Sequence, residues 1–140
     1  MICYAVIDTN VLVSAVLSGK DDAATVQVIG KVLSGEIIPV YSSAITKEYR
    51  EVLSRKKFGL PGGMVEYLLL AIEKYGILVS PSPSGVVLPD MKDLPFYEVV
   101  LEKRDDGAYL VTGNIKHFPK EPYGVTPREL LDVLESRQKT

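Results

Sequence analysis

The chain has 140 residues, of which 46% are hydrophobic and 24% charged, and its formal net charge at neutral pH is −2. This length suits a single domain, residues 1–140, with a substantial apolar core, and the charge argues against binding nucleic acid through overall positive charge. No apolar run approaches the roughly 20 residues of a membrane span and no leader-like start is present, so we expect a cytoplasmic protein with no membrane contact.

Strand-like apolar runs alternate with helical patterns along the chain. In order, the sequence predicts a strand near 3–8, helices near 10–18 and 22–34, a strand at 37–41, helices at 43–57 and 64–75, a strand at 77–80, a helix at 94–103, a strand at 108–112 and a helix at 127–138. Strands that alternate with helices favour a parallel sheet covered on both faces. We therefore predict an α/β protein, a three-layer α/β/α sandwich with a central, mostly parallel sheet.

The last helix has the clearest predicted start. Thr126 is placed as its N-cap, Pro127 at its first position and Glu129 where a capping box needs an acid. The expected result is a pair of reciprocal hydrogen bonds between Thr126 and Glu129.

Asp8 follows the apolar run 4–7 and is predicted to emerge at the carboxyl end of a buried strand. Ligands bind at that edge in open α/β sheets. The position makes Asp8 a candidate for a site before any other residue is considered.

Glu48 lies within the apolar stripe of the helix predicted at 43–57. The stripe is formed by Ile45, Tyr49, Val52 and Leu53. An ionised carboxylate buried without a partner costs several kcal/mol, so Glu48 needs a cation, a hydrogen-bond donor or a cleft. The alternative is a glutamate at the edge of the stripe that reaches water.

Two more segments carry polar side chains toward the same edge. Asp93 precedes a helix start, so capping that helix is a sufficient explanation for it, and Asp90 is expected to be solvated with the same site in reach. Asn114 follows the strand at 108–112 as Asp8 follows the first strand, so the two could meet, although asparagine also forms turns.

A single histidine, His117, and a single cysteine, Cys3, exclude a His/Cys zinc site within one chain. A bound metal would be a hard cation on oxygen ligands, such as Mg²⁺ or Mn²⁺. We expect Cys3 to be a buried thiol and His117 to be a loop or packing residue rather than a general base. Dinucleotide-binding and P-loop glycine motifs are absent, and Asn10 stands where an aspartyl-phosphate phosphatase needs a second aspartate.

Four segments in this order, 6–15, 48–53, 90–96 and 109–114, resemble the PIN domain family. The resemblance covers nearly the whole chain and is closest to prokaryotic toxin components of toxin–antitoxin systems, similar to VapC. It implies an α/β/α sandwich and a metal-dependent ribonuclease whose acids meet at the carboxyl edge of the sheet. By position, Asp8 matches the family's first acid, Glu48 the second and Asp93 the third.

The chain departs from the family pattern at the fourth position. Many relatives have an aspartate where this chain has Asn114, and Lys116-His117 replaces a second acidic position. Asparagine can supply a carbonyl oxygen but removes one negative charge. We therefore expect one well-held metal, with a second ion weakly held or absent unless Asp90 compensates.

The resemblance also implies roles for the site residues. Asp8 and Asp93 would be the main ligands of Mg²⁺ or Mn²⁺, and Glu48 would bind through water or help to take the proton of the attacking water. Asn10 and Thr112 would orient Asp8. RNA would be cut to a 5′-phosphate and a 3′-hydroxyl.

The expected partners are an RNA substrate, a cognate antitoxin and a second copy of the chain. Candidate contacts to the RNA backbone are Lys92, Lys116, Arg55, Lys56 and Lys57, although a solvated helix end also explains the last three. A homodimer is suggested by the family and by Leu68, Leu69, Leu70 and Ile72, which core packing explains nearly as well. The alternative function is a catalytically weak or inactive PIN-fold module that binds an antitoxin or RNA, with a generic phosphatase as a third possibility.

Overall fold

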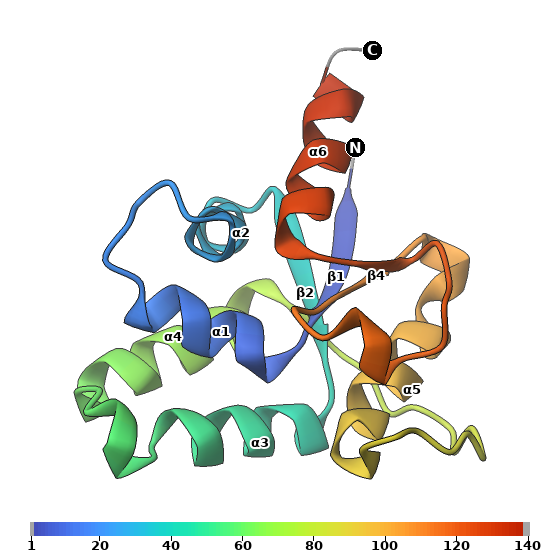
Figure 1. Ribbon diagram of the computed structural model, residues 1–140, viewed down its shortest axis with the longest axis horizontal. Coiled ribbons are helices and arrows are strands. Elements are labelled where there is room, and N and C mark those ends of the chain that lie inside the picture. Colours follow the sequence, from blue (N-terminus) through green and yellow to red (C-terminus); the bar gives the residue numbers. More distant parts are fainter. Residues whose placement is uncertain (1, 139–140) are drawn as a thin grey trace.

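The computed structural model of the chain describes residues 2–138, in which five strands form one sheet surrounded by helices (Figure 1). The strands are β1 (Cys3–Ile7), β2 (Ile37–Tyr41), β3 (Ile77–Leu78), β4 (Tyr109–Val111) and β5 (Gly124–Val125). Their order in the sheet is β3-β2-β1-β4-β5, and every neighbouring pair is parallel. The predicted α/β class with a central parallel sheet is confirmed.

The helices are α1 (Thr9–Leu17), α2 (Ala24–Leu33), α3 (Ser43–Leu53), α4 (Gly62–Tyr75), α5 (Leu94–Glu102) and α6 (Pro127–Gln138). The chain leads outward from β1 through β2 to β3 and then returns through α5 to β4 on the other side of β1. Because such crossovers are right-handed, α5 covers the face of the sheet opposite the helices that precede it. Within residues 2–138, no helix has the length and apolar content that crossing a membrane requires.

The central strand β1 is buried on both faces, as expected for an inner parallel strand. Cys3, Ala5, Val6 and Ile7 are buried, and Cys3 is a free thiol, as predicted. Burial also raises the pKa of the Cys3 thiol. The strand therefore holds the backbone at Asp8, its next residue, in a fixed position at the edge of the sheet.

Helix α3 begins just after the carboxyl end of β2 and runs beneath α1, at the lower edge of the view in Figure 1. Its buried Tyr49 joins the helix to the sheet, because the phenol hydroxyl donates a hydrogen bond to the carbonyl oxygen of Ile7. The Tyr49 ring also lies with its centroid 6.1 Å from that of Phe96 on α5. Tyr49 thus connects α3 to both β1 and α5 at the carboxyl end of β1.

The prediction that the helix beginning at Ser43 continues to residue 57 was wrong. Helix α3 ends at Leu53, Arg55 is extended, and a separate 3₁₀ turn spans Lys56–Phe58. Gly59 follows with a φ of +61°, a left-handed conformation that glycine adopts at little cost, and the chain reverses there toward α4. Propensity alone gave no reason to stop the helix before this reversal.

The short strand β5 was absent from the predicted elements. Its neighbourhood pairs with β4 through hydrogen bonds from the Leu110 nitrogen to the Tyr123 oxygen, at 2.8 Å, and from the Thr112 nitrogen to the Val125 oxygen, at 3.0 Å. An element of two residues is too short to show a periodicity, which explains the omission.

The start of α6 follows the prediction. The Glu129 nitrogen donates to the Thr126 hydroxyl oxygen at 3.2 Å, and the Thr126 nitrogen donates to Oε1 of Glu129 at 2.9 Å. These are the two bonds of a capping box. The predicted reciprocal cap of Thr126 and Glu129 is confirmed.

The apolar residues of α4 serve mainly the core. Leu68, Leu69 and Ile72 are buried, whereas Leu70 is 61% exposed. Core packing therefore accounts for three of the four residues on which the homodimer expectation rested.

Candidate active site

Asp8 is 4% exposed at the carboxyl end of β1, and its environment is built to hold a carboxylate. Oδ2 accepts hydrogen bonds from the Thr112 hydroxyl, at 2.7 Å, and from Nδ2 of Asn10, at 3.0 Å. The Asp8 backbone nitrogen donates to the Val111 oxygen at 2.9 Å, which continues the pairing of β1 with β4. Both the backbone and the side chain of Asp8 are therefore fixed.

The two donors to Asp8 also hold the chain after β4. The Thr112 hydroxyl oxygen accepts a hydrogen bond from the Asn114 nitrogen at 2.9 Å. Oδ1 of Asn10 accepts one from the Gly113 nitrogen at 3.1 Å. Asp8 and the turn at 112–114 consequently form one connected network of hydrogen bonds.

Glu48 reaches this region from the side of α3. It is half-buried, and its Oε2 accepts a hydrogen bond from the hydroxyl of Thr9, the residue after Asp8. The carboxylate therefore has a partner, as its place in the apolar stripe requires. Sequence reasoning did not single out Thr9, because nothing in the spacing links it to a residue 39 positions away.

Asp93 lies at the start of α5 and does not cap this helix as its position in the sequence had suggested. It occupies the N-cap position of α5, but its side chain makes no capping hydrogen bond, so the capping explanation was wrong. Its backbone has helical angles as the last residue of the 3₁₀ turn Met91–Asp93, whereas a capping side chain needs an extended backbone. Oδ2 of Asp93 instead lies 3.2 Å from Nδ1 of His117, which is the donor when Asp93 is ionised.

His117, predicted as a loop or packing residue, lies in the loop between β4 and β5 and is the partner of this acid. It lies in the 3₁₀ turn Ile115–His117, and its side chain is 44% exposed while that of Asp93 is 16% exposed. The sequence offered no signal for this pair, because the contact depends on how the chain after β4 folds back toward α5.

The three acids influence one another electrostatically. Burial is the main cause that raises the pKa of Asp8, Glu48 and Asp93 above their ordinary values. Beyond burial, the charge of Asp93 raises the pKa of Asp8, the charge of Asp8 raises that of Glu48, and Glu48 adds to that of Asp93. The acids therefore form one cluster of negative charge at the carboxyl edge of the sheet.

The remaining candidate residues lie around this cluster. Asp90 is exposed, accepts a hydrogen bond from the Lys92 nitrogen at 3.0 Å, and its charge raises the pKa of Asp93. Lys92, whose charge lowers the pKa of Glu48, and Lys116 are exposed on the two adjoining turns. Asn114 is exposed, with its backbone rather than its side chain bonded to Thr112.

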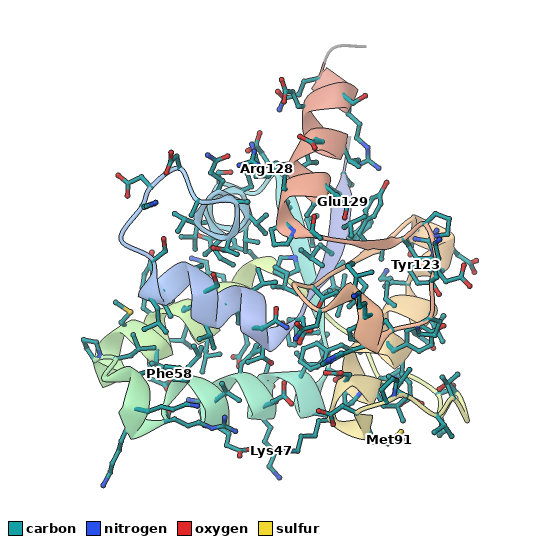
Figure 2. All side chains as sticks on the ribbon, in the orientation of Figure 1. Lys47, Phe58, Met91, Tyr123, Arg128 and Glu129 are labelled. Carbon is teal, nitrogen blue, oxygen red and sulfur yellow. The ribbon has the colours of Figure 1, made fainter. Side chains whose placement is uncertain are left out.

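The basic cluster at 55–57 lies apart from these residues. It is exposed beyond the carboxyl end of α3, roughly 10 Å along the chain from Glu48 at the rise of an α-helix. Lys47, labelled in Figure 2, extends from the outer side of α3. Of the basic residues considered, Lys92 is the one whose charge acts on an acid of the cluster, and Lys116 precedes His117, the partner of Asp93.

The chemistry of the cluster fits a hard divalent cation, because its donors are carboxylate oxygens. The side-chain positions do not complete a site: among residues 2–138, no three His, Cys, Asp or Glu side chains are arranged to hold a metal ion. Glu48 is turned to Thr9 and Asp93 to His117. To share one ion with Asp8, these two side chains would have to turn from their present partners.

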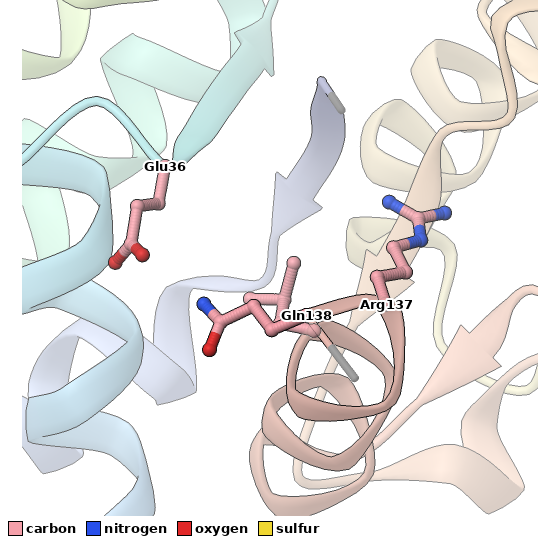
Figure 3. A pocket seen from close by; sticks show the side chains of 4 residues that line it. Glu36, Arg137 and Gln138 are labelled. Carbon is pink, nitrogen blue, oxygen red and sulfur yellow. The ribbon is translucent and has the colours of Figure 1, made fainter. Parts of the chain in front are cut away.

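A separate cavity of about 310 Å³ lies at the opposite, amino edge of the sheet. Figure 3 shows Glu36 on one side of it and Arg137 and Gln138, at the end of α6, on the other. Because the strands are parallel, this edge is the far end of the sheet from Asp8. The cavity therefore has no part in the carboxylate cluster.

Comparison with known proteins agrees with the geometry. A family model described as a PIN domain matches residues 4–116, a range that includes Asp8, Glu48, Asp93 and Asn114. Searches of curated proteins and of solved structures found no match. PIN domains are in general metal-dependent nucleases. The family model covers well over half of the sequence, so the chain belongs to the PIN domain family.

Proposed function

We propose that this chain is an endoribonuclease that uses Mg²⁺ or Mn²⁺ to hydrolyse RNA phosphodiester bonds. The observation that carries the proposal is the convergence of Asp8, Glu48 and Asp93, from three separate elements, at the carboxyl edge of the sheet in a PIN domain. A bound divalent ion would neutralise the phosphate, lower the pKa of a water and stabilise the leaving oxygen.

The protein groups would divide the remaining work. Asp8 is the most rigid of the acids, because Thr112 and Asn10 hold one oxygen of its carboxylate. Asp93 would be the second ligand, with His117 as the partner that orients it. Glu48 would bind through water or accept a proton from the attacking water, and its raised pKa suits a group that takes up a proton.

The number of ions is expected to be low. Asn114 supplies no charge, and its side chain is exposed. Asp90, on the turn before α5, is an additional carboxylate whose charge acts on Asp93. We propose one well-held ion, bound through Asp8 and Asp93, and a weak second one at most.

We further propose that the chain is the toxin of a toxin–antitoxin pair. Support comes from the resemblance of four segments to VapC-like PIN domains and from the retention of all three acids. A toxin should stop growth when it is expressed in bacteria without its antitoxin, and Asp8→Asn should restore growth at equal protein levels. Asp132→Asn, an exposed acid on α6, is the matched control and should remain toxic.

One observation favours a second function, a PIN-fold module that acts by binding. Within residues 2–138, the side chains of Asp8, Glu48 and Asp93 are not arranged to hold a metal ion together, and Asn114 adds no negative charge. If growth arrest survives Asp8→Asn, the protein acts by binding an antitoxin or RNA, and the nuclease proposal is wrong.

A further inference from the structure

A groove of about 290 Å³ lies beside the carboxylate cluster. One wall comes from Ser43 at the start of α3, another from Ser80 and Pro81 after β3, and the third from Pro95 and Glu98 on α5. Pro95 and Glu98 are three residues apart on a helix and therefore share one face. None of the three acids Asp8, Glu48 and Asp93 is among the residues that line the groove.

The sheet places this groove next to the acids. β1 and β2 are neighbouring parallel strands, paired as far as Ala5 and Pro39. Asp8 is the residue after β1 and Ser42 the residue after β2, so both lie at the carboxyl edge of the sheet, at the ends of adjacent strands. Ser42 is itself part of the groove lining, and Pro95 follows Asp93 by two residues. An RNA strand with a phosphate at Asp8 would therefore place an adjoining nucleotide in or near the groove.

The polar groups of the groove select against a phosphate. The Glu98 carboxylate would repel an anion, and it is held in place because its Oε2 accepts a hydrogen bond from the Ser84 nitrogen at 2.6 Å. No residue in the described range 2–138 donates a hydrogen bond to Oε1 of Glu98. This oxygen is an available acceptor for the N–H groups of a ligand.

The other walls suit a planar ring with a carbonyl group. Pro81 and Pro95 present apolar surface, and the hydroxyls of Ser43 and Ser80 can donate hydrogen bonds. A nucleobase carries this combination, and single-stranded RNA is read by hydrogen bonds to unstacked bases. The groove is therefore matched to a base and not to the backbone of the strand.

We propose that this groove binds a guanine base adjacent to the phosphate that is cleaved, an inference that rests on the proposed ribonuclease function. Guanine has two neighbouring N–H donors, at N1 and N2, for the Glu98 carboxylate, and its O6 accepts from a serine hydroxyl. Adenine, cytosine and uracil do not combine adjacent N–H donors of this kind with a carbonyl acceptor. Glu98 would then be a residue that determines specificity.

The test measures binding and cleavage separately. Fluorescence anisotropy in EDTA follows the binding of short single-stranded RNAs that differ only in one base, guanine, inosine or adenine, by wild type, Glu98→Gln and Glu102→Gln. Glutamine can still accept from the Ser84 nitrogen, and Glu102 is an exposed acid one turn along α5. We expect wild type and Glu102→Gln to prefer guanine over adenine by about tenfold, with inosine between them, and Glu98→Gln to lose the preference.

Equal binding of all three RNAs by wild type, or an undiminished guanine preference in Glu98→Gln, would overturn the proposal. The substrate series decides the matter even if the variant folds poorly, because it uses the native chain. A guanine preference in EDTA without cleavage in Mg²⁺ or Mn²⁺ would support the groove and refute the nuclease. Cleavage in Mg²⁺ or Mn²⁺ with no preference for a neighbouring guanine would support the nuclease and refute the guanine groove.

Discussion

The hydroxyl of Thr112 donates a hydrogen bond of 2.7 Å to Oδ2 of Asp8, joining residues 104 positions apart in the sequence. Thr112 is completely buried, and the same hydroxyl oxygen accepts the Asn114 nitrogen at 2.9 Å. One small side chain therefore fixes both the acid at the end of β1 and the turn that follows β4.

Replacing Thr112 by valine should lower RNA cleavage by about 10- to 100-fold, because groups that orient a metal ligand contribute roughly that much. Valine has nearly the same shape but neither donates to Asp8 nor accepts from Asn114. Thr112→Ser keeps the hydroxyl and should retain most of the activity. Cleavage rates and Mn²⁺ affinity by calorimetry check this, and a fully active Thr112→Val would show that the hydrogen bond does not matter.

Replacing Tyr49 by phenylalanine should lower the free energy of unfolding by about 1–3 kcal/mol, since the buried Ile7 carbonyl would lose the hydroxyl that donates to it. Tyr67 on α4, which is 67% exposed, provides the control, and Tyr67→Phe should change stability little. Urea unfolding of the two variants beside wild type measures the difference. Equal stability of all three proteins would contradict the role given to Tyr49.

The elements that position the acids follow from local sequence patterns, which explains why they could be predicted. The apolar run that ends in Asp8 and the apolar stripe that contains Glu48 each show, within a single segment, which residues are buried. The contacts of Thr9 with Glu48 and of His117 with Asp93 join distant segments, and no spacing in a single sequence encodes such a contact. The strand β5 was missed because two residues show no periodicity, and the end of α3 was missed because helix propensity gives no sign of the 3₁₀ turn and the reversal at Gly59 that follow it.

The stability of the metal-free protein should fall as the pH rises through the range in which Asp8 ionises. Burial raises the pKa of Asp8 in the folded chain, so between its unfolded and folded pKa values the folded state binds more protons than the unfolded state. Under that condition the free energy of unfolding decreases with pH. The stability that protonated Asp8 contributes is fully present below the pKa of this group in the unfolded chain, and it is lost above its pKa in the folded chain.

Asp8→Asn removes this titration while its amide oxygen can still accept from Thr112. In EDTA, the melting temperature of Asp8→Asn relative to wild type should therefore rise with pH across the acidic range. Thermal melts at a series of pH values check the trend, and the exposed variant Asp132→Asn should not show it. A difference between wild type and Asp8→Asn that is constant with pH would contradict the assigned burial of this carboxylate.

The number of metal ions that the chain binds should depend on the residue at position 114. Titration of wild type with Mn²⁺ by calorimetry should show one ion per chain, because Asn114 brings no charge to the cluster. Asn114→Asp should tighten binding or add a second ion, whereas Asn114→Ala should leave the first ion nearly unaffected. Two equally strong ions in wild type would show that Asp90 or another group replaces the missing acid.

The most direct test of the proposed nuclease is the cleavage of labelled single-stranded and structured RNA by purified wild type and Asp8→Asn, in Mg²⁺, in Mn²⁺ and in EDTA. Wild type should cut RNA only with a divalent ion, leaving a 5′-phosphate and a 3′-hydroxyl, and Asp8→Asn should not cut in any condition. Cleavage that persists in EDTA or in Asp8→Asn, or no cleavage by wild type of any RNA, would contradict the assignment of Asp8, Glu48 and Asp93 as a metal-dependent catalytic site.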